Sequence, residues 1–217
     1  MYKTIVICGI DGSGKTNVAN SLKKFSQKKS RVIIIWFRWR ALFTYALYLY
    51  SNIMHQYKQV FNPRLGMYNK VSDWSRDAFL RKFYPYILLF DMLIFYFLIK
   101  VKLFFSKPRI VIFDRFFIDA LLDVAYETMN PKVLKSIPAY ITYALARKAD
   151  KCVFLDVDPR IAYERKKDII SIGELKYKQT FYRYIAKVMG FSIIDTSNYK
   201  VEDVVNNILE LCQDLHL

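Results

Sequence analysis

The sequence predicts an α/β fold in which a five-stranded parallel sheet carries helices on both faces. Five short runs rich in apolar and β-branched residues recur along the chain, at positions 3–8, 31–36, 109–113, 151–156 and 190–195. The segments between them carry apolar residues at helical spacing, and this alternation indicates parallel strands joined by right-handed crossovers. With 217 residues, no internal repeat and no linker rich in Gly, Ser or Pro, the chain is expected to form one domain, 1–217.

The first strand, 3–8, runs directly into a glycine-rich turn and then into a helix. The turn spells Gly9-Ile10-Asp11-Gly12-Ser13-Gly14-Lys15-Thr16. It fits the phosphate-loop pattern of a glycine, four free positions and then Gly-Lys-Ser/Thr. The other reading, a glycine-rich turn with an incidental lysine, is disfavoured because chance matches rarely fall between a strand and a helix.

Such a loop points backbone N–H groups into one concavity at the positive end of a helix dipole. We therefore expect Lys15 to reach the β- and γ-phosphates of a nucleoside triphosphate and the Thr16 hydroxyl to bind Mg²⁺. Residues 9–16 other than Ile10 form the predicted ATP site: Gly9, Asp11, Gly12, Ser13, Gly14, Lys15 and Thr16.

The third strand ends in Asp114, followed by Arg115 and Phe116. An aspartate that closes an apolar strand downstream of a phosphate loop is a Walker-B arrangement, which puts the carboxylate near Mg²⁺. Asp114 is therefore the second predicted metal residue. Its alternative role is that of a helix cap.

The stretch 36–85 is aromatic and basic, and its pattern predicts helices with a break near 62–66 and a helix start near 72–75. Pro85 is expected to open a helix that runs to about Phe105. A membrane span here is disfavoured because Asp91 and Lys100 interrupt its apolar runs, and a core helix is favoured instead.

Four stretches together resemble the thymidylate kinase family of nucleoside monophosphate kinases. Residues 9–16 resemble its Gly-x-Asp-Gly-x-Gly-Lys-Thr/Ser loop, and 111–116 resemble its Val-Ile-x-Asp-Arg-Tyr, with Phe for Tyr. Residues 154–165 are similar to the strand and helix that lead into its lid, and 194–204 to its last strand and adenine-side loop. The resemblance implies the three-layer fold of P-loop NTPases and the use of ATP and Mg²⁺.

Applied position by position, the resemblance assigns roles to the residues that would bind ATP, the phosphate donor. Lys15, Thr16 and Asp114 hold ATP·Mg²⁺, Thr196 lies on the adenine side, and Arg115 touches the transferring or acceptor phosphate. Asp11 faces the acceptor sugar or the metal. Because Ser13 is not an arginine, the catalytic cation is expected from the lid region, 160–176; the candidates are Arg165, Lys166 and Lys167. A solvated basic helix face is the alternative for these three.

The acceptor side departs from the family. Phe90, in Leu88-Leu89-Phe90, is the candidate to stack on the acceptor base, with core packing as its alternative. The family's arginine one turn later falls on Ile94, and Asp119 and Val124 replace its base-reading Ser and Gln. Arg38 or Arg40 is expected to grip the acceptor phosphate through a bidentate fork, and the sequence does not choose between them.

The charge composition of the chain indicates which kinds of partner to expect. The chain has 34 Lys+Arg against 19 Asp+Glu, a net charge of +15, which suits a polyanion. The leading hypothesis is a kinase that transfers the γ-phosphoryl of ATP to a nucleoside monophosphate, dTMP by family default. One alternative is a kinase with a sugar, lipid precursor or other small acceptor. The other is an ATP-binding protein held on an anionic membrane or nucleic acid.

The resemblance also implies an assembly, because the thymidylate kinase family is usually dimeric and the apolar helix at 85–105 could supply an interface. We expect a homodimer, no stable nucleic-acid partner, and peripheral membrane contact as an open option. Three widely spaced cysteines and no secretory signal indicate a cytoplasmic protein.

Overall fold

The computed structural model describes residues 2–27, 30–38, 42–169 and 171–212. Its main sheet has five parallel strands in the order β2-β5-β1-β6-β7. The strands are β1 (Lys3–Cys8), β2 (Val32–Trp36), β5 (Ile110–Asp114), β6 (Lys151–Asp156) and β7 (Ser192–Asp195). The predicted fold class and all five predicted strands are therefore confirmed.

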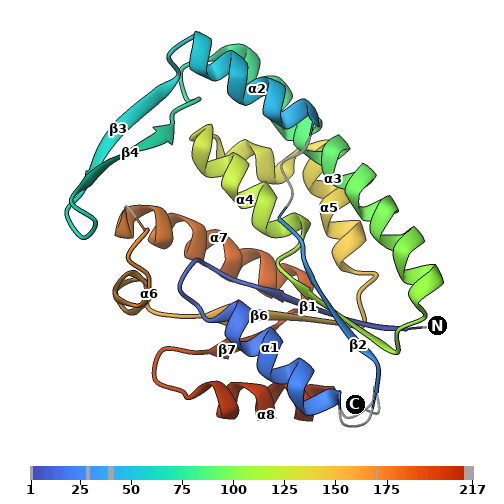
Figure 1. Cartoon of the computed structure of the whole chain (residues 1–217). Coiled ribbons are helices and arrows are strands. Elements are labelled where there is room, and N and C mark those ends of the chain that lie inside the picture. The colour runs from blue at the N-terminus through green and yellow to red at the C-terminus, as the bar shows by residue number, and fades with distance from the viewer. Residues whose placement is uncertain (1, 28–29, 39–41, 170, 213–217) are drawn as a thin grey trace.

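Helices cover both faces of this sheet and complete three layers (Figure 1). On one face lie α1 (Lys15–Ser26) and α8 (Val201–Leu211). The other face carries α3 (Ala78–Ser106), α4 (Phe117–Glu127), α5 (Ile137–Ala146) and α7 (Ile172–Met189). The remaining helices are α2 (Leu42–Ile53), the 3₁₀ turn η1 (Pro131–Lys135) and α6 (Pro159–Arg165). Two clusters of buried side chains, one on each side of the sheet, form the core.

The segment between α2 and α3 is a β-hairpin, which corrects the helical reading of this region. Strands β3 (Tyr57–Asn62) and β4 (Met67–Ser72) pair antiparallel. The break predicted at 62–66 is the hairpin turn, where Gly66 has φ +65°. These strands pair only with each other, outside the main sheet. They consequently lack the continuous apolar run by which the five core strands can be recognised.

A single helix, α3, stands where the sequence predicted one helix start near 72–75 and another at Pro85. The start at 72–75 is wrong, because β4 runs to Ser72 and the helix begins at Ala78. Asp77 caps it, its carboxylate accepting from the backbone N–H of Leu80 at 2.9 Å, and Pro85 lies inside the helix. One face, including Leu88 and Met92, is buried, whereas the opposite face is exposed, so α3 is a covering helix and not a fully buried core helix. Across the described residues, no helix combines the length and apolarity that crossing a membrane requires.

One tryptophan fastens the hairpin to the helical layer. Trp74 is fully buried, and its Nε1 donates to the Ser51 hydroxyl of α2 at 2.7 Å. Its ring packs edge-on against Tyr84 of α3, whose hydroxyl donates to Glu127 of α4 at 2.9 Å. These contacts fix the hairpin base against α2, α3 and the end of α4, and the hairpin tip reaches toward α6 (Figure 1).

Candidate active site

The loop between β1 and α1 requires glycine at two positions. A Cβ on Gly9 would lie 2.5 Å from the Leu155 carbonyl oxygen, and a Cβ on Gly12 only 2.4 Å from that of Ala162. Both residues also have left-handed φ values, +152° and +84°. Helix α6 thus packs directly on the loop, and the first-turn N–H groups of α1 begin immediately after Gly14.

Lys15 lies within this loop and is only 4% exposed. Its Nζ donates to the carbonyl oxygens of Gly9 at 2.6 Å and Ile10 at 2.7 Å. Burial, and then the nearby Arg115 guanidinium, lowers the pKa of Lys15 to about 8. A phosphate placed here would raise the pKa of Lys15 again, because a bound anion stabilises the ammonium.

Thr16 and Asp114 meet across the end of the sheet. The Thr16 hydroxyl donates to Asp114 Oδ2 at 2.6 Å, whereas Oδ1 of the same carboxylate is buried and has no hydrogen-bond partner among the described residues. A buried carboxylate oxygen without a partner fits a cation. One carboxylate and one hydroxyl, completed by phosphate oxygens and water, is a donor set that Mg²⁺ takes. The described residues hold no cluster of three or more His, Cys, Asp or Glu side chains that would suggest another metal.

Asp11 joins two arginines beside this pair. Arg115 Nη2 lies 2.5 Å from Asp11 Oδ1, and Arg38 Nη1 lies 4.0 Å from Oδ2. Burial alone would raise the pKa of Asp11, but Lys15 and then Arg115 hold that pKa well below its ordinary value. Arg115 has φ +73°, which is uncommon outside glycine and tends to occur at functional sites. The structure therefore brings together the predicted residues Asp11, Arg38 and Arg115.

Acidic residues of α4 extend this charged group, and sequence reasoning missed their role. Asp119 is buried and accepts from the Tyr182 hydroxyl at 2.6 Å. Asp123 pairs with Arg38 at 3.4 Å and with the buried Lys178 at 2.7 Å. The signal was present in the sequence: Asp119, Asp123 and Glu127 recur every four residues and so share one face of a helix.

The structure does not bring the predicted lid cations to this group. Arg165 donates instead to the carbonyl oxygens of Thr196 at 2.8 Å and Ser197 at 3.0 Å. Lys166 pairs with Asp168 at 3.1 Å, and Lys167 is exposed. Their catalytic role stays a prediction.

Thr196 contacts the phosphate loop itself. Its buried hydroxyl donates to the carbonyl oxygens of Asp156 at 2.9 Å and Ser13 at 3.2 Å. The Ser13 hydroxyl is buried without a hydrogen-bond partner among the described residues. Thr196 thus supports the loop backbone next to the predicted adenine side.

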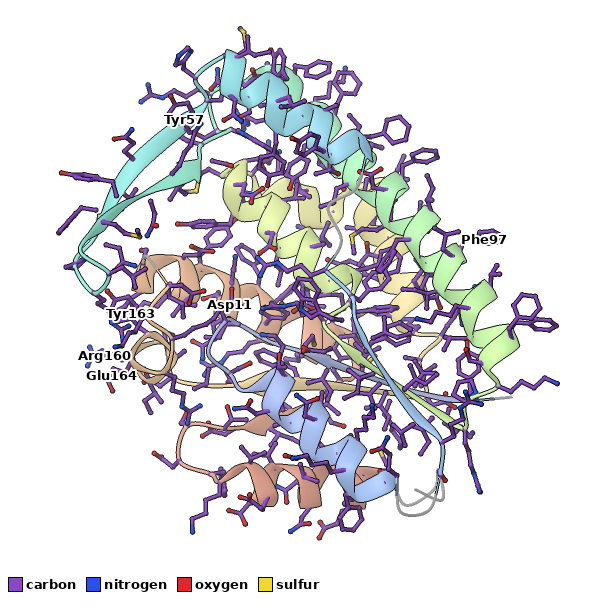
Figure 2. All side chains as sticks on the ribbon, viewed as in Figure 1. Asp11, Tyr57, Phe97, Arg160, Tyr163 and Glu164 are labelled. Atoms are coloured by element: carbon purple, nitrogen blue, oxygen red, sulfur yellow. The ribbon has the colours of Figure 1, made fainter. Side chains whose placement is uncertain are left out.

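Phe90 does not face this group. Its ring is 54% exposed and packs on Phe43 of α2, 5.6 Å between centroids. Phe97, two turns further along the same face, points away from the body of the molecule in Figure 2. The prediction that Phe90 stacks on an acceptor base is therefore not supported, because helix rotation turns it outward. Arg40 lies outside the described residues, so only Arg38 can be placed.

The hairpin tip holds the end of α6. The Arg64 guanidinium donates to the backbone carbonyls of Tyr163 and, at 2.9 Å, Glu164, and it stacks over the Tyr163 ring at 4.5 Å. Asn62 Nδ2 donates to the Lys167 carbonyl at 3.1 Å. Figure 2 shows Tyr163 and Glu164 below the hairpin tip. The hairpin tip thereby caps the carbonyl end of α6.

Arg64→Ala should loosen the segment after α6. Hydrogen bonds from a charged donor contribute about 1.5–3 kcal/mol, so local opening should become about tenfold more frequent. Limited trypsin digestion should cut at Arg165 to Lys167 correspondingly faster. Arg76→Ala, which removes an exposed arginine ahead of α3, serves as the control. Equal cleavage rates in wild type and Arg64→Ala would contradict this role.

The lowered pKa of Lys15 predicts how ATP affinity depends on pH. The charged Lys15 ammonium binds phosphate, and the bound phosphate raises the pKa of Lys15. Above pH 8 the free protein has lost this proton, so ATP binding must be accompanied by the uptake of one proton. Affinity should be level below pH 8 and fall above it, approaching tenfold per pH unit. Calorimetry in buffers of different ionisation enthalpy measures both the affinity and the proton uptake. A constant affinity from pH 7.5 to 9.5 would contradict the prediction.

The parallel sheet order, the phosphate loop and the adjacent Thr16–Asp114 pair define the fold of a P-loop NTPase. Among solved structures, the chain is similar to the thymidylate kinase of Ehrlichia chaffeensis, with a TM-score of 0.56 and 18% identity. The similarity covers 97% of this chain and 98% of that one. No protein-family model matches the sequence, and no curated protein matches it.

Proposed function

We propose that the protein transfers the γ-phosphoryl group of ATP to a nucleoside monophosphate, with dTMP as the first acceptor to test. The observation that carries this proposal is the cluster Asp11–Arg38–Arg115 beside the buried Lys15. In this cluster, the arginines that would bind an acceptor phosphate lie next to the loop that would bind the donor phosphates. The similarity in fold to a thymidylate kinase over nearly the whole chain supports the same assignment.

The chain's own residues would act through position and charge. Lys15 and the N–H groups of the loop hold the donor phosphates, and Arg115 neutralises charge on the transferring group. Thr16 and Asp114 would hold Mg²⁺, whose charge would offset that of the donor phosphates. Asp11 keeps Arg115 oriented. Arg38, which lies 4.0 Å from Asp11 and 3.4 Å from Asp123, would exchange these long contacts for an acceptor phosphate. No covalent intermediate with the protein is required.

The side chains around the site favour a second candidate acceptor. Phe90 faces outward, and Asp119 and Val124 stand where the resembled family reads a base with Ser and Gln. Asp123 and Glu127 follow Asp119 on the same face of α4. Carboxylates accept hydrogen bonds from hydroxyl and amino groups and reject bare carbonyl oxygens. A phosphorylated sugar or another hydroxyl-rich small molecule therefore competes with dTMP as acceptor.

A coupled ADP-release assay decides between these acceptors. ATP·Mg²⁺ is supplied with dTMP, dUMP, UMP, CMP, AMP, GMP and a set of sugar phosphates, and Lys15→Ala is the inactive control. Turnover on a monophosphate, absent in the control, would establish the kinase and its acceptor. ATP binding without turnover on any nucleoside monophosphate would overturn the leading proposal, and turnover on a sugar phosphate would establish the second.

We also propose that two chains associate through the outer face of α3. Eight apolar residues follow one another there at spacings of three and four, each at least 40% exposed. They extend over about 38 Å. This α3 stripe consists of Phe79, Phe83, Tyr86, Phe90, Ile94, Phe97, Val101 and Phe104. The acidic residue of α3, Asp91, is buried and accepts from the Thr44 hydroxyl at 2.6 Å, so no carboxylate of α3 interrupts the stripe. An apolar face of this length marks an interaction surface, and symmetric dimers are the commonest assembly.

Light scattering after size-exclusion chromatography tests the dimer. Wild type should have the mass of two chains, and Phe90→Asp/Phe97→Asp the mass of one. Phe25→Asp, which charges a similarly exposed phenylalanine of α1, should leave the dimer intact. A monomeric wild type that binds anionic vesicles through the same two residues would replace the dimer with membrane contact.

A further inference from the structure

A groove separate from the candidate active site lies between η1, α5 and α7. Its volume is about 960 Å³, within the range of small-molecule pockets. Helix α7 divides the two regions: Tyr182 points to Asp119 of the active site, whereas Tyr184 lines the groove. Nothing in the proposed phosphoryl transfer uses this cavity.

The groove has an apolar floor and aromatic walls. Leu134 and Ile185 are buried beneath it, and Tyr140 and Tyr184 are 64% and 58% exposed along its sides. The Tyr143 hydroxyl donates to the Leu134 carbonyl at 3.0 Å. Burial, and then Tyr184 and Tyr140, raises the pKa of Tyr143 to about 12, so the Tyr143 hydroxyl stays neutral at physiological pH. An apolar chain laid here would remove its surface from water.

The rim of the groove is cationic. Lys132 and Lys135 lie together on η1 at one end, Arg147 follows α5 at the other, and no acidic residue lines the cavity. Within the described part of the chain, none of these three cations forms an ion pair. Two lysines on one 3₁₀ turn, facing an apolar channel, complement a ligand whose anionic head is attached to a hydrocarbon chain.

We propose that this groove binds a single-chain alkyl phosphate, with the phosphate at Lys132 and Lys135 and the chain running along α5 and α7. The chemistry of the lining favours an alkyl chain over a nucleobase. A nucleobase requires paired donors and acceptors, whereas the neutral polar side chains here are hydroxyls, those of Thr180 and the tyrosines. A bilayer surface would contact protruding residues, but the cavity is concave and takes a single chain.

Titration calorimetry with decyl phosphate, below its micelle concentration, tests the proposal on the full chain. Wild type should bind one molecule per chain saturably. Lys132→Glu/Lys135→Glu should weaken binding about tenfold or more, because two attractive charges become repulsive. Lys23→Glu/Lys24→Glu, which makes the same charge change on α1, should bind like wild type. Decanol and inorganic phosphate, each offering half of the ligand, should bind at least tenfold more weakly.

A second variant tests the cavity and not the charge. Ala144 is exposed and lines the groove, so Ala144→Trp would fill it without overpacking the core. Binding should be lost while the circular dichroism spectrum and melting temperature are unchanged. Unchanged binding in Ala144→Trp, equal affinity for decanol, or binding to anionic vesicles without binding to decyl phosphate would each overturn the proposal. None of these measurements depends on kinase activity, so they test this binding site independently of the proposed function.

Discussion

Replacing Lys15 with alanine is expected to lower ATP turnover about 10³-fold or more. The Lys15 ammonium is buried inside the phosphate loop, 2.6–2.7 Å from two of its carbonyls, where no other cation reaches the same point within the described structure. In such a water-poor site one preorganised charge contributes about 4 kcal/mol to transition-state stabilisation. Initial rates of ADP release at saturating ATP and acceptor measure the loss.

Lys24→Ala is the matched control, because it removes an exposed lysine from the far end of the same helix α1. Its rate should stay within twofold of wild type. Thermal melting of Lys15→Ala separates catalysis from folding: loss of an ammonium that is costly to bury should leave the protein at least as stable. A Lys15→Ala enzyme with more than a tenth of wild-type activity would refute the role of this loop in catalysis.

Replacing Arg115 with alanine is expected to lower kcat/KM about 10²–10³-fold. Arg115 contacts Asp11 at 2.5 Å and lies 3.9 Å from the buried Asp119, so its removal leaves two carboxylates without their shared cation. The loss has two parts: charge neutralisation at the transferring phosphate, and orientation of Asp11. Full progress curves over acceptor concentration separate kcat from KM.

Arg115→Lys gives the sharper comparison. It keeps the charge but loses the planar fork, so it should recover part of kcat while the KM for the acceptor stays raised. Arg109 is exposed and lies just before the first residue of β5, at the end of the strand opposite to Arg115. Arg109→Ala should therefore behave like wild type. If Arg115→Ala changes kcat/KM less than threefold, the acceptor phosphate binds elsewhere.

The position of the hairpin and the pairing of Asp123 depend on contacts between residues far apart in the sequence, which local patterns do not reveal. Arg64 binds carbonyls about a hundred residues downstream, and nothing near position 64 in the sequence indicates that partner. The same holds for Asp123, which pairs with Arg38 and Lys178 from two other elements. The outward rotation of Phe90 follows from the burial of its neighbours Leu88 and Leu89, which pattern alone leaves ambiguous.

The five sheet strands, their parallel arrangement and the phosphate loop with Thr16 and Asp114 could all be predicted from the amino-acid sequence. These features are encoded locally, in apolar runs long enough to be buried and in a motif whose spacing is set by the backbone of one turn. Three further arrangements became visible in the folded chain alone: a hairpin caps α6, Arg38 joins Asp11 and Arg115, and α3 turns an apolar stripe outward. Those arrangements depend on which faces pack together across distant parts of the chain, and local spacing does not specify that choice.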